Sequence, residues 1–374
     1  MREWSNPFNP FNSMKVLLWK EHLEACARGQ YLPPVTVDID PVNACNLDCV
    51  YCNAFDAMNA HSEMKCLPEG HLLRITDFMA EWRDEEKHGP YSACVAGGGE
   101  PLLNQGTMAL LERMHDHSLE AGLITNGTLL GEEKIKIIAR TCRWVGVSVD
   151  AATPTTYNKL KGVKEKGLYD KVIENIQSLV HEVDKAKSNC RIAFKYLIHP
   201  WNVHEIYTAV LIARRLGVHD FHARPVGLVN ITKTEKSDAA FSAHDVVMIR
   251  DQFESVTSAD VETERFHVYG INHKFNYDLT PKKNFKKCWA IPLLPTFGAD
   301  GWIHTCFDMR GRPDLKLCKH FPEPSELRRI WNTDHHKKVL SRINVDKCPR
   351  CTFTVYNQAV EQAIINDNMC RYFP

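Results

Sequence analysis

The chain has 374 residues, 44% of them apolar, a length that suits two domains or one large domain with an appendage. Lys plus Arg and Asp plus Glu number 46 each, and no basic run is dense enough to predict a nucleic-acid or membrane-surface partner. The first residues lack the layout of a signal peptide, and no apolar stretch approaches the roughly 18 residues of a membrane span. We therefore expect a soluble, cytoplasmic protein with no nucleic acid and no membrane partner.

Six short apolar runs alternate with longer amphipathic segments between residues 34 and 226. This alternation predicts parallel strands joined by right-handed helical crossovers. Six units are too few for a closed eight-fold barrel, so we expect an α/β fold with an open or partial (β/α)6 barrel, whose chemistry lies at the carboxyl ends of the strands. The expected strands are Val35–Ile39, Ala93–Ala96, Gly122–Thr125, Trp144–Val149, Ile192–Ile198 and Asp220–Arg224.

Apolar periodicity predicts helices over 168–183 and 203–216, and a third around Pro324–Arg342. For the second helix, Asn202 is the expected N-cap, Glu205 would complete a capping box, and Gly217 stands at the C-cap position. We divide the chain into an N-terminal extension at 1–33, the partial barrel at 34–226, a connector at 227–285 and a small cysteine-rich domain at 286–374.

Fourteen cysteines in a reducing compartment indicate metal ligands rather than disulfides. Cys45, Cys49 and Cys52 form a CX3CX2C pattern directly after the first expected strand. Three thiolates ligate only three irons of a 4Fe–4S cluster, so the fourth iron stays open to the amino and carboxylate groups of a ligand. A four-cysteine zinc or electron-transfer site, with Cys66 as the fourth ligand, is the alternative.

The CX3CX2C pattern, with an aromatic residue before its last cysteine, resembles the signature of the radical S-adenosylmethionine (SAM) superfamily. GGGEP at 97–101 matches a second family motif, and AATPTTYNKLKG at 151–162 is similar to a third. The resemblance implies reductive cleavage of SAM to methionine and a 5′-deoxyadenosyl radical, which takes a hydrogen atom from a substrate carbon. It also implies an external electron donor such as flavodoxin or ferredoxin. By resemblance, the SAM contacts are Tyr51, Gly98, Gly99, Glu100, Asn126, Ser148, Asp150, Lys195 and Arg224.

For Lys195 and Arg224, a strand-end charge that faces solvent is an equally acceptable interpretation. The GGGEP stretch taken alone is an ordinary turn, although its glycines would let the backbone approach a ligand closely. The motifs gain weight because each follows an expected strand in chain order.

A second set of cysteines occupies the last quarter of the chain. Its order resembles the SPASM extension, or the shorter Twitch form, which hold auxiliary iron–sulfur clusters. The full SPASM pattern continues with further cysteines where this chain has Asn357 and Glu361, so the shorter form with one auxiliary 4Fe–4S cluster fits best. A structural zinc is the alternative, because zinc also accepts four thiolates. The expected ligands are Cys288, Cys306, Cys348 and Cys351.

Cys318 and Cys370 belong to neither set. Each is an extra ligand, a hydrogen-atom donor to a substrate radical, or a buried thiol without function. An auxiliary cluster that accepts an electron would make the reaction an oxidation of a small molecule such as a sugar or aminosugar. A thiol donor would instead make the enzyme a redox-neutral epimerase.

Peptide-modifying relatives often carry a leader-binding domain before the barrel, and only about 33 residues precede the first expected strand. This favours a small-molecule substrate over a peptide, unless a separate protein presents the peptide. The alternative from a different class is a non-catalytic iron–sulfur or zinc-stapled binding protein, which would not need the motifs that follow the strands.

Overall fold

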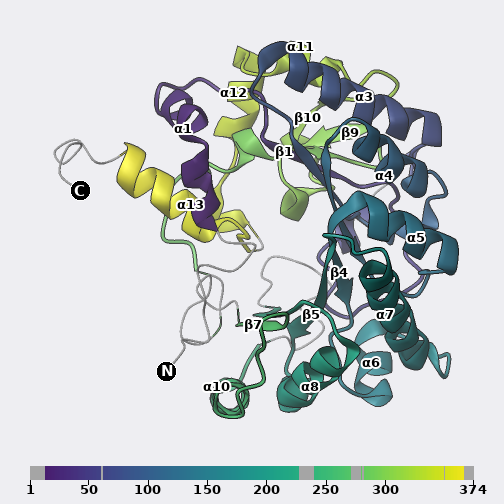
Figure 1. The fold of residues 1–374 in the computed structure, drawn as a ribbon. Coiled ribbons are helices and arrows are strands. Elements are labelled where there is room, and N and C mark those ends of the chain that lie inside the picture. The colour runs from purple at the N-terminus through teal and green to yellow at the C-terminus, as the bar shows by residue number, and fades with distance from the viewer. Residues whose placement is uncertain are drawn as a thin grey trace.

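The computed structural model describes residues 13–59, 62–226, 240–270, 279, 282–348 and 350–365. In these residues ten strands form one sheet in the order β10-β9-β8-β1-β2-β3-β4-β5-β6-β7. Helices line the outside of the curved sheet (Figure 1). No helix among the described residues has the length and apolar character needed to cross a bilayer.

Six consecutive parallel strands form the barrel, and each ends within about two residues of its expected bounds. The predicted partial (β/α)6 barrel is therefore confirmed. The strands are β1 (Thr36–Ile39), β2 (Ser92–Val95), β3 (Glu120–Thr125), β4 (Cys142–Ser148), β5 (Arg191–Ile198) and β6 (Asp220–Pro225).

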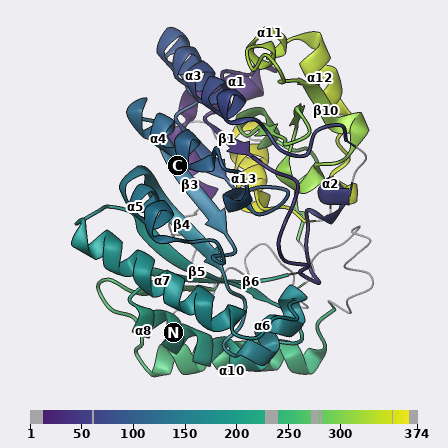
Figure 2. The same ribbon diagram turned by 90° about the vertical axis from the view of Figure 1, so that its right-hand side faces the viewer.

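Crossover helices cover the convex face of these strands (Figures 1 and 2). The larger ones are α3 (Glu69–Glu86), α4 (Thr107–Asp116), α5 (Glu132–Thr141), α7 (Leu168–Lys185) and α8 (Ile206–Leu216). The shorter helices of the first half are α1 (Lys20–Ala27), α2 (Phe55–Asn59) and α6 (Pro154–Lys161). Short 3-10 helices lie at Ser13–Leu18, Pro101–Leu103, Val203–Glu205, Ile291–Leu293, Phe307–Met309, Pro313–Leu315 and Val345–Lys347, and a short π-helix lies at Val360–Ile365.

Residue alternation gives the two faces of the barrel different characters. In β5 the outward side chains are apolar or aromatic and fully buried under the helices, whereas Lys195 faces the concave side. Gly146 in β4 leaves room for this lysine, because a Cβ there would lie 2.6 Å from Lys195 Cδ. The concave face therefore carries the polar groups of the barrel.

The predicted capping box before α8 is wrong. A single helical turn precedes Ile206, and the Asn202 side chain donates hydrogen bonds to two backbone carbonyls instead of capping. The Glu205 carboxylate accepts from one backbone amide and two threonine hydroxyls near residue 153. Gly217 does end the helix in the left-handed conformation, with φ of 78°, as predicted.

The region expected to be a connector holds α10 (Ala243–Ser258) and β7 (His267–Gly270), which extends the barrel parallel to β6. At the other end, β8 (Thr296–Phe297) pairs parallel with β1. β9 (Trp302–His304) and β10 (Lys316–Lys319) follow in antiparallel order. The cysteine-rich region is thus joined to the barrel through one continuous sheet.

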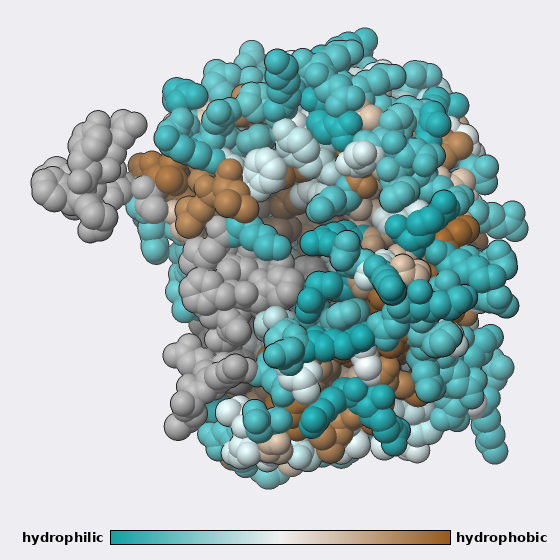
Figure 3. Space-filling view, in the orientation of Figure 1, coloured by the Kyte–Doolittle hydropathy of each residue, from teal (hydrophilic) through white to brown (hydrophobic). Residues whose placement is uncertain are grey.

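The predicted helix at 324–342 is two helices, α11 (Glu326–Ile330) and α12 (Asp334–Ser341). Asn332 breaks it with a φ of 62°, and the Trp331 indole donates to the Leu32 carbonyl. α11 lies beside α3 (Figure 2), where Arg328 pairs with two glutamates. The chain continues through α13 (Thr354–Ala359), and apolar side chains gather over its end in Figure 3.

Candidate iron–sulfur and SAM site

Cys45, Cys49 and Cys52 lie on the loop after β1, at the carboxyl end of the barrel strands. Burial is the main reason why the pKa of the Cys49 thiol is raised to about 12. The Cys45 and Cys52 thiolates raise this pKa further, so the three thiols lie close enough to interact electrostatically. Among the described residues, no three His, Cys, Asp or Glu side chains already stand as a set of metal ligands. The structure thus groups the three thiols on one loop without arranging them as ligands.

The donor chemistry of this loop fits a cluster held by three thiolates. The Lys161 ammonium group partly opposes the effect of burial on the pKa of Cys49, and a neighbouring cation of this kind favours the thiolate that iron requires. Burial alone raises the pKa of Cys66, and no other described thiol contributes. Cys66 is exposed and accepts a hydrogen bond from Asn104, so its surroundings do not support it as a fourth ligand.

The GGGEP turn packs directly against the cysteine loop. A Cβ on Gly99 would lie 1.8 Å from the Ala44 carbonyl oxygen, and a Cβ on Gly98 would lie 2.1 Å from Asn43 Oδ1. The Gly99 and Glu100 amides donate to backbone carbonyls of the loop at 3.0 and 2.9 Å. The glycines are required here because no side chain fits between turn and loop.

Glu100 links this turn to the next one and is fully buried. Its carboxylate accepts hydrogen bonds from the Thr125 hydroxyl at 2.6 Å and the Asn126 amide at 2.7 Å. The Asn126 side chain in turn donates to Asn46 at 2.9 Å and points toward the Cys45 sulfur at 3.9 Å. The predicted residues Glu100 and Asn126 therefore connect the turns after β2 and β3 to the cysteine loop through hydrogen bonds.

Tyr51 and Asp150, both predicted SAM contacts, contact each other. The Tyr51 hydroxyl donates to the Asp150 carboxylate at 2.6 Å, and the backbone amide of Leu197 donates to its other oxygen at 2.6 Å. Lys161, which the sequence analysis did not single out, forms a buried ion pair with the same carboxylate. Burial opposes the charge of Lys161, but the Asp150 carboxylate holds its pKa above the usual range.

Lys195 and Arg224 both lie on the concave face, near the carboxyl ends of β5 and β6. Burial and the neighbouring Arg224 lower the pKa of Lys195 to about 8. Burial and Arg350 lower the pKa of Arg224 to about 9. Ser148, at the end of β4, is in register with Lys195. The two cations thus face the barrel interior rather than bulk solvent.

The four cysteines predicted to hold an auxiliary cluster converge from three segments. Burial raises the pKa of Cys288 to about 12, with further contributions from Cys351 and Cys348. Burial also raises the pKa of Cys306 well above its usual range, and Cys288 and Cys351 contribute. Cys288 is thus within electrostatic range of the other three thiols, although the four, like the first set, do not already stand as metal ligands among the described residues. Four thiolates fit either an iron–sulfur cluster or zinc.

Asn357 and Glu361 stand where the longer pattern has cysteines, and both hold the segment that contains Cys288. Asn357 accepts hydrogen bonds from the Trp289 and Ala290 amides and donates to the Cys351 sulfur at 3.5 Å. Glu361 accepts from two backbone amides just before Cys288. These residues replace ligands with hydrogen bonds that keep two cysteine segments together.

The two remaining predicted cysteines differ in what the structure says of them. Cys318 is buried on β10, at the edge of the sheet beyond β9, β8 and β1. Cys370 lies outside the described residues. Cys94, which the sequence analysis did not single out, donates a hydrogen bond to Asp38 inside the barrel. The strand alternation of β2 could have predicted this contact, because it places the Cys94 side chain on the same face of the sheet as that of Asp38, its register partner in β1.

Residues 39–192 match the Radical SAM superfamily. This part of the chain is a radical SAM domain. Members of that superfamily use a 4Fe–4S cluster and SAM, in agreement with the donor set after β1. The resemblance drawn from the cysteine and glycine motifs is therefore confirmed.

Curated relatives match about half of this chain. An AdoMet-dependent heme synthase of Methanosarcina barkeri is 26% identical over 179 residues, which are 48% of this chain and 46% of that protein. A probable GTP 3′,8-cyclase of Saccharolobus solfataricus is 25% identical over 200 residues, 52% of this chain and 59% of that protein. The alignments thus span roughly half the length of these relatives.

Solved structures with a similar fold extend the likeness into the cysteine-rich region. Streptococcus suis SuiB, bound to its precursor peptide SuiA, superposes with a TM-score of 0.62 at 16% identity and covers 91% of this chain and 73% of SuiB. The enzyme anSMEcpe with bound AdoMet gives a TM-score of 0.57 at 16% identity, covering 82% and 83%. At this identity the likeness concerns the fold.

Proposed function

We propose that this chain is a radical SAM enzyme with its catalytic 4Fe–4S cluster on Cys45, Cys49 and Cys52. When bound, the cluster and SAM supply a 5′-deoxyadenosyl radical that abstracts a hydrogen atom from the substrate. The observation that carries this proposal is the three-thiol loop packed on a glycine turn at the carboxyl end of the strands. An electron carrier would need neither that turn nor the cationic barrel interior.

The side chains around the loop have distinct roles in this proposal. Glu100 and Asn126 fix the loop from the β2 and β3 turns. The glycine turn, with Gly98, Gly99 and Glu100, offers its backbone to the methionine end of SAM. Lys195 and Arg224 present positive charge from the concave face, where a carboxylate or a ribose hydroxyl would accept their hydrogen bonds.

Cysteine replacement tests the assignment of the first cluster. We expect Cys49→Ala to abolish 5′-deoxyadenosine formation when the anaerobically reconstituted protein receives SAM and dithionite. Cys66→Ala is the matched control and keeps the product, because Cys66 is exposed and apart from the three thiols. Product formation by Cys49→Ala would refute the proposal, and loss of iron in Cys66→Ala would restore the four-cysteine alternative.

We further propose one auxiliary 4Fe–4S cluster on Cys288, Cys306, Cys348 and Cys351. The convergence of these thiols supports it, as does the use of Asn357 and Glu361 for hydrogen bonds instead of further ligation. Reconstituted protein is then expected to hold about eight irons per chain and no zinc. Cys288→Ala should halve the iron, whereas zinc retained at one equivalent would show a structural site instead.

For the substrate we propose a small molecule that is oxidised, with the auxiliary cluster as electron acceptor and a flavodoxin- or ferredoxin-type donor for the first cluster. Two features support this: the matched curated relatives are named for small molecules, and Cys318 lies on a sheet edge rather than in the barrel. Turnover in deuterated water is the test. Solvent deuterium at a carbon of the product would show a thiol-quenched epimerisation and refute oxidation.

A further inference from the structure

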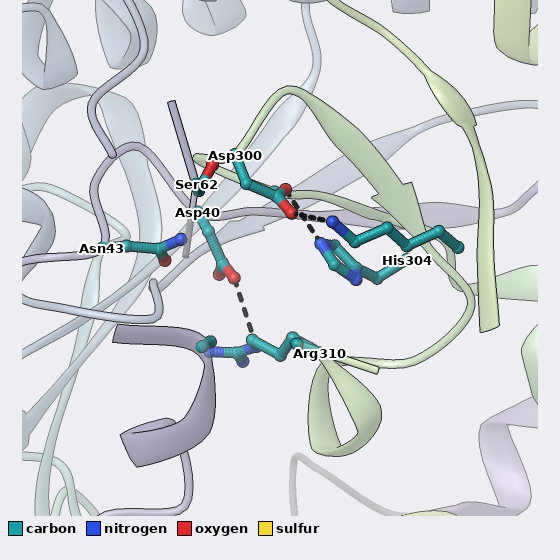
Figure 4. Close-up of a pocket in the computed structure, with 10 residues that line it drawn as sticks. Asp40, Asn43, Ser62, Asp300, His304 and Arg310 are labelled. Carbon is teal, nitrogen blue, oxygen red and sulfur yellow. Dashed lines mark hydrogen bonds and ion pairs between the residues drawn. The ribbon is translucent and has the colours of Figure 1, made fainter. Parts of the chain in front are cut away.

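The segment after Cys306 reaches from the cysteine-rich region into the SAM site. The Arg310 side chain is only 7% exposed, and its Nη1 donates to the Gly97 carbonyl oxygen at 2.6 Å. Its Nε lies 3.2 Å from the carboxylate of Asp40, which is 1% exposed (Figure 4). One arginine from the last quarter of the chain thus holds both the end of β1 and the glycine turn.

Asp308, two residues earlier, links the loops of the two cysteine sets. Its Oδ1 accepts hydrogen bonds from the side chains of Asn53 and Arg350, each at 3.1 Å. Its Oδ2 accepts from the Thr352 hydroxyl at 3.3 Å. Asn53 directly follows Cys52, while Arg350 and Thr352 flank Cys351. The Cys306–Arg310 segment therefore contacts the loop of the first three cysteines, the loop around Cys351 and the glycine turn. Of the segments with predicted ligands, the one around Cys288 is not among these contacts.

Among the described residues Arg310 is the cation that forms an ion pair with Asp40, while His304 acts on the same carboxylate only through a weaker electrostatic contribution. Lys316 and His304 both bind Asp300, at 2.8 and 2.9 Å, and these three residues line the same cavity as Asp40. Figure 4 shows the His304 ring directed toward Asp300. The cavity has a volume of about 20 Å³, enough for one water molecule but not for another side chain. Loss of the guanidinium would therefore leave Asp40 as a buried carboxylate without an ion pair, compensated only by His304 across the cavity and by at most a water molecule.

We infer that Arg310 is a positioning residue that couples SAM binding at the first cluster to occupancy of the auxiliary site. The inference rests on the proposed function, since it takes the Gly97 turn as the SAM-binding turn. Gly97 has a φ of 132°, and Arg310 fixes the direction of its carbonyl. Ligation of Cys306 orders the segment that carries Arg310, and by linkage SAM stabilises the same arrangement.

The test measures SAM affinity without turnover. Wild-type protein, Arg310→Gln and Arg310→Lys are reconstituted anaerobically and reduced, and SAM is titrated against the electron paramagnetic resonance signal of the first cluster. Arg310→Gln is expected to raise the Kd about tenfold, within the usual range of coupling between sites. Arg310→Lys is expected to recover part of the affinity. Arg329→Gln is the control, because that side chain is 78% exposed.

A double-mutant cycle with Cys288→Ala tests the coupling itself. If Arg310 transmits occupancy, Cys288→Ala weakens SAM binding in the wild-type background and adds little to Arg310→Gln. Additive effects, or an unchanged Kd in Arg310→Gln, would overturn the inference. If Arg310→Gln loads iron poorly, the Kd for SAM is measured on Arg310→Lys and Asp308→Asn instead. A wild-type Kd in both of these variants would overturn the inference. A wild-type signal that does not respond to SAM would instead refute the proposed function.

Discussion

At the scale of single residues, the interior of the barrel mouth depends on charges that compensate one another. Asp150 is surrounded by Tyr51, Lys161 and the Leu197 amide, and it adopts a φ of 64°. Such a conformation is uncommon for a residue with a Cβ and persists only where neighbours fix it. The Lys161–Asp150 pair therefore shapes the loop that follows β4 as well as the surroundings of Cys49.

We expect Lys161→Met to reduce the free energy of unfolding by about 3 kcal/mol, since it leaves Asp150 buried without its ion-pair partner. Urea unfolding of the apoprotein, followed by circular dichroism, measures the change. Lys166→Met removes an exposed lysine from the same region and is the control. Equal midpoints for the two variants would show that the ion pair contributes nothing to the fold.

The buried carboxyl group of Asp38 should make the stability of the protein depend on pH. Burial and the neighbouring Asp40 raise its pKa to about 7 in the folded protein. Between about pH 4 and pH 7 the Asp38 carboxyl is therefore ionised in the unfolded chain but still protonated in the folded protein. Because the folded state binds the extra proton, Asp38 lowers the free energy of unfolding as the pH rises through this range. Asp38→Asn removes the titration. Its gain in unfolding midpoint over wild type should be larger at pH 7 than at pH 4.5, and a constant difference would contradict the raised pKa.

The sequence predicted the ligand sets but not the residues that hold them. Cys45, Cys49 and Cys52 follow from spacing along eight residues of chain. Asp308 and Arg310, in contrast, act on partners 255 and 213 positions away. Charge alone does not reveal such pairs, because most charged side chains of a protein this size lie at the surface.

At the scale of elements, glycines decide how closely loops and strands approach. Gly99 has no room for a Cβ against the Ala44 backbone, whereas Gly70 at the start of α3 has nothing within 4 Å of that position. The same residue type thus has a required role in one element and none in the other. This difference can be measured directly.

We expect Gly99→Ala to push the cysteine loop away and to reduce iron bound after reconstitution to less than half of the wild-type amount. Gly70→Ala should bind iron normally and gain up to about 0.5 kcal/mol in stability, because alanine favours a helix. Iron and protein assays on both variants check this. Full iron loading by Gly99→Ala would show that the loop does not depend on the glycine turn.

Strongly periodic elements were predictable, and short or irregular ones were not. The six barrel strands and the helix α7 follow from β-branched runs and a clear apolar face. β8 and β9 contain two and three residues and exist only because β1 offers a free edge. The division of the predicted helix at 324–342 depends on Trp331, whose indole is anchored to a residue some 300 positions earlier.

At the scale of the whole molecule, the barrel and the cysteine-rich region share one sheet. β8 binds the edge of β1, and Arg310 binds Asp40 at the end of the same strand. α11 adds ion pairs from Arg328 to Glu85 and Glu86 on α3. The C-terminal quarter thus completes the side of the barrel next to the loop that carries Cys45, Cys49 and Cys52.

We therefore predict that a chain ending at residue 285 does not fold as an independent barrel. The truncation would expose the β1 edge, which invites pairing between chains, and would remove both the Arg310 guanidinium and the residues that cover Asp40. Size-exclusion chromatography and urea unfolding should show aggregation or a broad transition, whereas the full chain unfolds cooperatively. A monomeric, cooperatively unfolding product would mean that the cysteine-rich region is an appendage, and coupling through Arg310 would then have to act on an already stable SAM site.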